Sequence, residues 1–164
     1  MGTFEEIFGS CVLDGKVYLV GGCEHHSNAP SDRAFLCFDP ATGAWEHSAT
    51  SGAEGATLPA HPSPPNAALV AAHGGKVWVM AGNPPAQVGP ANHSSDDTGI
   101  APSPVWTYTP GADAWEPGPD FPTHQSWGAA ASFGGKLYAI SGAHGTGAST
   151  GIIFDPRMFV LEED

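Results

Sequence analysis

Apolar residues along this chain occur in short runs that are closed by glycine or proline. One run returns three times at a fixed spacing, as Val17–Val20, Val77–Met80 and Leu137–Ile140, and a Gly-Lys pair precedes each copy. The three lysines of these pairs are the only lysines in the chain and lie 60 residues apart: Lys16, Lys76 and Lys136. A period of this size indicates a repeat architecture, in which each unit buries its apolar faces against its neighbours. We therefore predict that the three lysines are equivalent and that each begins the second strand of its unit.

A second apolar stretch precedes each lysine run, at residues 10–13, 67–72 and 129–133. The two stretches of a unit are separated by Asp-Gly or Gly-Gly, namely Asp14-Gly15, Gly74-Gly75 and Gly134-Gly135. Such dipeptides favour the positive φ angles of tight hairpin turns. Each unit is thus predicted to begin with an antiparallel hairpin.

A third apolar stretch follows a polar loop and ends at proline, at residues 35–40, 105–110 and 152–156. Proline cannot donate to a strand ladder, so it is expected to end the strand there. Trp45 and Trp115 then open a fourth strand, and Leu161 stands at the position expected for the third tryptophan. The opening segment 4–8 has the size of an outer strand and is expected to complete a blade.

The strand runs are apolar at consecutive positions, so their sheets must be covered on both faces. Four-stranded antiparallel blades stacked around an axis satisfy this need, and the pattern predicts an all-β propeller fold with almost no helix. The chain is interpreted as a single propeller segment over residues 1–164, with blades at about 9–48, 66–118 and 127–161. Because propellers need roughly four to eight blades, three would be half of a six-bladed ring.

These units resemble the kelch repeat. The first unit carries the pattern most closely, in Val20-Gly21-Gly22, Phe38-Asp39-Pro40 and Trp45. In the second unit Ala81-Gly82 replaces the glycine pair and Thr109 replaces the aspartate, and the third unit has Ser141-Gly142. The resemblance implies a kelch-type β-propeller that binds a protein or a ligand through its long loops.

The charge of the chain narrows the classes of partner. Its formal net charge is −12, which argues against nucleic acid or an acidic membrane surface, since both need a basic patch. No stretch is long and apolar enough for a membrane span, and the first residues lack the pattern of a signal peptide. Cys11, Cys23 and Cys37 form no zinc-ligand pair and are interpreted as reduced thiols. A cytoplasmic protein is expected.

Six of the eight histidines are predicted to lie at one end of the stacked sheets. Strand direction alternates in a meander, so the loops after each second strand emerge beside the connections between units. We predict that this loop face binds a ligand or partner through His25, His26, Asp32, His61, His93, Asp96, His124, Trp127 and His144. The alternatives are that these histidines are merely solvated and that Trp127 packs between blades.

No residue is assigned a catalytic role. Imidazoles beside carboxylates could hold a divalent metal or perform acid–base chemistry, but no pair has the spacing of a known metal motif. The expected function is an interaction or ligand-binding module without a resident cofactor. The alternative is a kelch-propeller enzyme that acts on a sugar or small polar substrate, with or without the help of a metal on the histidine-rich face.

Three blades would leave two apolar sheet faces open. Two copies could close a six-bladed ring, or further blades of a longer chain could do so. A homodimer is the preferred expectation, because the chain starts with methionine and ends in acidic Glu162-Glu163-Asp164.

Overall fold

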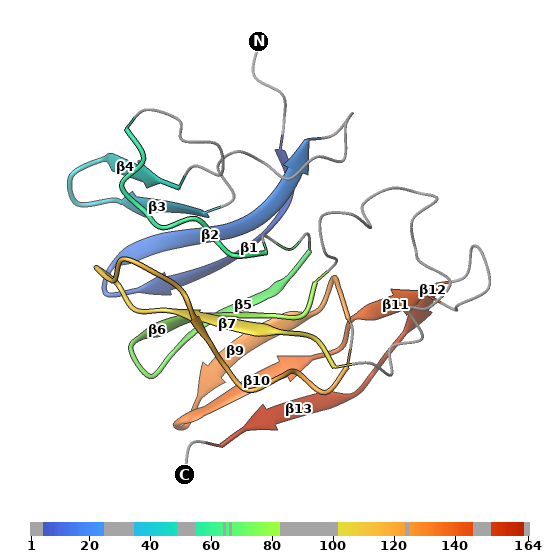
Figure 1. Ribbon diagram of the computed structural model, residues 1–164. Helices are drawn as coiled ribbons and strands as arrows, with labels where there is room; N and C mark the ends of the chain where they lie inside the picture. Colours follow the sequence, from blue (N-terminus) through green and yellow to red (C-terminus); the bar gives the residue numbers. More distant parts are fainter. Residues whose placement is uncertain are drawn as a thin grey trace.

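The structure, a computed structural model, describes residues 5–24, 35–48, 55–63, 65, 67–82, 102–123, 125–145 and 152–162. These residues form antiparallel strands and turns and include no helix. None of the described segments could therefore cross a membrane as an apolar helix. Figure 1 shows the sheets stacked one after another in chain order. The predicted all-β fold of stacked antiparallel blades is confirmed.

The first two units are four-stranded meanders in which each strand pairs with the next along the chain. The first contains β1 (Glu5–Leu13), β2 (Lys16–Glu24), β3 (Phe35–Asp39) and β4 (Ala44–His47). The second contains β5 (Leu69–His73), β6 (Lys76–Met80), β7 (Val105–Tyr108) and β8 (Glu116–Pro117).

The hairpin turns have the predicted conformation. Asp14 and Gly15 have φ of 50° and 76°, and Gly134 and Gly135 have φ of 59° and 76°. Two successive positive φ angles match the twist of the flanking strands. Lys16, Lys76 and Lys136 follow these turns as the first residues of β2, β6 and β10 (Lys136–Ile140), as predicted.

The third unit differs from the sequence prediction. Its sheet has three strands, β9 (Ala129–Phe133), β10 and β13 (Met158–Leu161), while β11 (Ala143–Gly145) pairs with β12 (Ile152–Phe154) as a separate two-stranded sheet. Leu161 pairs with Leu137, just as Phe38 pairs with Val17 in the first blade. Leu161 therefore occupies a third-strand position, and its assignment to the tryptophan position of a fourth strand was wrong.

Burial explains this register. Phe159 of β13 packs edge-on against Phe121 with ring centroids 4.9 Å apart, and Leu161 contacts the same core. Ile153 and Phe154 of β12 are exposed instead. The prediction for the opening segment was also wrong. Glu5–Leu13 is one continuous first strand whose beginning pairs with the end of β2, so it adds no outer strand.

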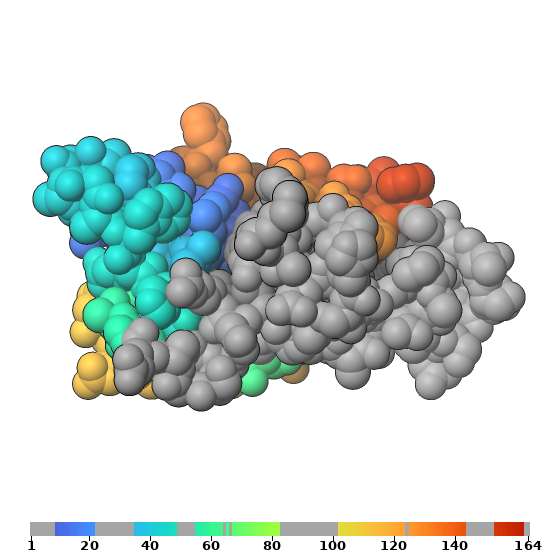
Figure 2. Space-filling view, turned by 90° about the horizontal axis from the view of Figure 1, so that it is seen from above, coloured from blue at the N-terminus to red at the C-terminus, as the bar shows by residue number. Residues whose placement is uncertain are grey.

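Two apolar cores lie between the three blades. One joins the first and second blades around Tyr18, Phe35 and Tyr108. The other joins the second and third blades around Trp78, Phe121 and Leu137. In Figure 2, β3 and β4 (cyan) lie toward one end of the molecule and the last strands (red) toward the other. The outer faces of the first and third blades have no neighbouring blade among the described residues.

Candidate functional site

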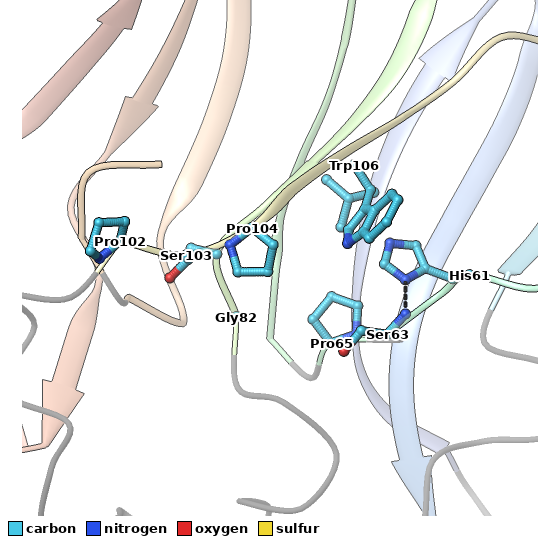
Figure 3. A pocket seen from close by; sticks show the side chains of 10 residues that line it. His61, Ser63, Pro65, Gly82, Pro102, Ser103, Pro104 and Trp106 are labelled. Carbon is cyan, nitrogen blue, oxygen red and sulfur yellow. Dashed lines mark hydrogen bonds between the residues drawn. The ribbon is translucent and has the colours of Figure 1, made fainter. Parts of the chain in front are cut away.

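A pocket opens on the loop face, the end of the sheets at which the β2–β3 and β6–β7 connections emerge (Figure 3). Its volume is about 150 Å³. Three segments build it: the connection between the first two blades, the end of β6 and the start of β7. The lining residues are His61, Ser63, Pro65, Val79, Ala81, Gly82, Pro102, Ser103, Pro104 and Trp106.

His61 is the buried polar group of this pocket. Its side chain is 3% exposed and its ring lies edge-on to Trp115, with centroids 4.6 Å apart. The backbone N–H of Ser63 donates to His61 Nδ1 at 3.1 Å, so Nδ1 is the acceptor and the ring proton resides on Nε2. Burial lowers the pKa of His61 to about 4. The imidazole is therefore neutral at pH 7.

Trp106 provides the second polar group. Its ring lies 6.2 Å from that of His61, centroid to centroid, at an angle of 74°. Trp106 Nε1 and His61 Nε2 are both buried, and neither has a hydrogen-bond partner within the described part of the chain. Figure 3 shows the two rings side by side next to Pro65 and Pro104. The pocket is thus lined by two aromatic rings whose N–H groups are buried and lack an acceptor among the described residues.

Unusual backbone angles shape the pocket wall. Ala81, which follows β6, has a φ of 53°, a left-handed conformation that side chains disfavour. Gly21 holds the corresponding position after Val20, with a φ of 91°. A Cβ at Gly21 would lie 2.1 Å from the carbonyl oxygen of Pro65, which is one of the residues that line the pocket. The glycine of the repeat therefore allows the connection between blades to pass close to β2.

The structure places three of the predicted site residues. His61 lies in the pocket but is buried, rather than projecting into solvent. Trp127 is 44% exposed, has a φ of 58° and donates its N–H to the carbonyl of Ala67 at 3.1 Å. The backbone of His144 pairs with Ile153 in the β11–β12 hairpin. The other predicted residues lie outside the described residues: His25, His26, Asp32, His93, Asp96 and His124.

Sequence reasoning missed Trp106. It pairs with Val79, at the position that Leu36 holds in the first blade and Phe159 in the third. In the sequence, Trp106 was identified only as part of the apolar third stretch at residues 105–110. The exchange of leucine for tryptophan at one repeat position was the available signal, because tryptophan adds an N–H that needs an acceptor.

A second polar cluster joins β12 and β13. Asp155 is buried and accepts hydrogen bonds from Gln125 Nε2 at 2.7 Å and from the backbone N–H and guanidinium of Arg157. The Arg157 side-chain bonds are the main reason that the pKa of Asp155 falls to about 2. The carboxylate takes its partners from the connection between β12 and β13 and from Gln125, which precedes β9, so we interpret the cluster as structural.

A metal centre has no support from the described residues. Among them, no three histidine, cysteine or acidic side chains gather closely enough to hold an ion. Cys11 and Cys37 are free thiols, and burial raises the pKa of Cys11 to about 12.

The comparison with known families supports the repeat interpretation. The family model described as the Kelch motif matches residues 8–51, which reach from within β1 to just beyond the end of β4. None of the curated proteins matches the chain. The resemblance inferred from the glycine pair, Phe38-Asp39-Pro40 and Trp45 is thereby confirmed.

Proposed function

We propose that this chain, a kelch-repeat β-propeller segment, is a binding module that holds a protein or small polar ligand on its loop face. The observation that carries the proposal is the pocket lined by His61 and Trp106, whose two buried N–H donors lack acceptors among the described residues. Buried donors normally have acceptors, so an opening on the surface that contains two of them favours a ligand. The kelch motif agrees with this role, since kelch propellers generally mediate interactions.

Binding accounts for the pocket better than catalysis does. The lining residues include neither a carboxylate nor a thiol. The Nδ1 atom of His61 already accepts a hydrogen bond from Ser63, and its low pKa makes it a weak base. The hydroxyl of Ser103 is engaged with the carbonyl of Thr123 at 3.0 Å. The groups present can orient a ligand, and no observation favours the enzymatic alternative.

Selection from a random peptide library on the immobilised chain tests this role. Pro102→Lys adds a bulky cation at an exposed rim position of the pocket, and Ala114→Lys adds the same group at the opposite end of the blade. We expect selected peptides to lose at least tenfold in affinity for Pro102→Lys and to bind Ala114→Lys as well as they bind the parent chain. Peptides that bind all three proteins equally would contradict a loop-face site.

We further propose that two copies associate to close the ring. The support comes from the repeat, because each blade shows one face to the blade before it and the other to the blade after it. The third blade exposes residues whose equivalents in the first blade are buried by the second blade. The exposed set is Ile140, Met158 and Val160, and the equivalent buried set is Val20, Phe35 and Cys37.

The open face of the first blade is the matching surface. Val17, Leu19, Leu36 and Phe38 occupy positions whose equivalents in the second blade pack against the blade before it. Those equivalents are Val77, Val79, Trp106 and Tyr108. The third blade of one copy therefore presents the type of face that the first blade of another copy receives. A twofold axis would create two identical seams.

A further inference from the structure

Two of the rings that line the loop-face pocket each carry a buried N–H group, and the chemistry of these groups restricts which ligand the pocket can hold. His61 contributes Nε2–H because Ser63 fixes Nδ1 as an acceptor, and Trp106 contributes Nε1–H. Neither group has an acceptor among the described residues. A buried donor that lacks an acceptor costs free energy, so the arrangement fits a ligand oxygen that accepts from both.

The size and walls of the pocket limit the ligand group. A volume of about 150 Å³ corresponds to about five water molecules in the liquid, which accommodates a group of a few heavy atoms. Pro65, Pro104, Val79 and Ala81 provide apolar walls around the two donors. The group that fits combines one acceptor oxygen with small apolar substituents.

Charge favours a neutral acceptor over an anion. His61 is neutral at pH 7, and no lysine or arginine lines the pocket. A carboxylate that leaves water without a cationic partner loses much of its solvation free energy. The chain also carries a net charge of −12, which disfavours the approach of an anion.

We propose that the pocket binds an amide carbonyl group, whose oxygen accepts hydrogen bonds from His61 Nε2–H and Trp106 Nε1–H. This inference rests on the proposed binding role of the loop face. The amide belongs either to a peptide backbone, where it is secondary, or to a primary amide such as an asparagine or glutamine side chain. Both sources present the same oxygen to the two donors, and small probes of each type distinguish them.

The indole N–H resonances in a nitrogen-15 spectrum of the whole chain report on the pocket directly. N-methylacetamide, acetamide and acetate are titrated at pH 7, and the Trp106 resonance is assigned as the one that disappears in Trp106→Phe. We expect the amides to shift this resonance to saturation and to bind at least tenfold more tightly than acetate. Trp78 is the internal reference, because its Nε1–H already donates to the carbonyl of His73 at 3.0 Å. Tighter binding of N-methylacetamide identifies a backbone amide, and tighter binding of acetamide a primary amide.

His61→Phe keeps an aromatic ring against Trp115 and removes one donor. We expect it to weaken amide binding by roughly three- to tenfold, the effect of one neutral hydrogen bond, while Ala114→Lys leaves binding unchanged. Absence of a saturable Trp106 shift with either amide, or affinity for acetate equal to that for the amides, would overturn the proposal. The peptide selection is independent of this result, since a loop-face partner sensitive to Pro102→Lys could still be found after the amide site had failed.

Discussion

At the scale of single residues, His61 is the group whose environment most changes its chemistry. Its folded pKa of about 4 lies below the ordinary value of 6.5, so between these pH values the unfolded chain binds more protons than the folded one. The stability that its neutral form contributes is complete above pH 6.5 and is lost as the pH falls toward 4. The group that presents a donor in the pocket is therefore also a source of acid sensitivity.

His61→Phe tests this linkage. From the two pKa values, we expect the parent chain to lose about 2 kcal/mol more than the variant in free energy of unfolding between pH 7.5 and pH 5. Urea denaturation at both pH values measures the difference. Equal pH dependence of the two proteins would show that His61 is not buried in its neutral form.

Gly21 shows why the repeat needs glycine after the second strand. Gly21→Ala places a Cβ 2.1 Å from the carbonyl oxygen of Pro65, whereas Gly15, which also has a positive φ, has nothing within 4 Å of an added Cβ. Both changes to alanine carry the cost of a left-handed conformation, roughly 1–2 kcal/mol. We expect Gly21→Ala to lower the free energy of unfolding by at least about 1 kcal/mol more than Gly15→Ala. Equal losses would mean that the backbone contact between blades is not close.

At the scale of elements, local signals predicted much of the fold. The two-residue turns and the lysines that follow them were correctly placed in all three units, because positive φ angles at Asp-Gly and Gly-Gly depend on only two residues. The third strand of the last unit was not placed correctly. Phe154-Asp155-Pro156 resembles the end of a strand, yet the pairing of Met158–Leu161 with β10 depends on packing against Phe121, a contact that no local pattern reveals.

The pocket was predictable only in part, because some of its features depend on residues that are far apart in the sequence. Strand parity placed His61 on the loop face, but its burial depends on Trp106 and Trp115, which lie far along the chain. The hydrogen bond from Ser63 that fixes its tautomer depends on local backbone geometry. Sequence alone indicated which end of the sheets carries the residue, and the structure shows that Nε2 is the ring atom without an acceptor among the described residues.

The two Asp-Pro sequences of the chain give a matched test of the third blade. Asp155 and Asp39 each accept a hydrogen bond from the backbone N–H two residues later, but Asp155 also accepts from buried Gln125 and from Arg157. We expect Asp155→Ala to cost about 2 kcal/mol more than Asp39→Ala, because it leaves the buried Gln125 amide without its acceptor. Chemical denaturation measures both values. Equal costs would mean that the cluster does not hold β12 and β13 together.

At the scale of the whole molecule, the main feature is the uncovered apolar face at each end of the stack of blades. Each blade buries its apolar side chains only where another blade covers it, and the first and third blades each have one uncovered face in the described part of the chain. Val12, Trp45, Phe133 and Met158 are among the large apolar side chains that remain exposed. Large exposed apolar patches usually mark an interface. The residue patterns of the two open faces match the two halves of a blade-to-blade contact, and this match is the basis of the proposal that a second copy covers them.

The mass of the chain in solution tests whether a second copy covers the open faces. Static light scattering coupled to gel filtration, at micromolar concentration, should give twice the 16.8 kDa of one chain. Ile140→Lys places a charge in the proposed seam and should return the mass to that of one chain, while Ala114→Lys, which lies away from the seam, should leave the doubled mass unchanged. A folded species with the mass of one chain would contradict closure by a second copy and would leave further blades as the occupants of the open faces.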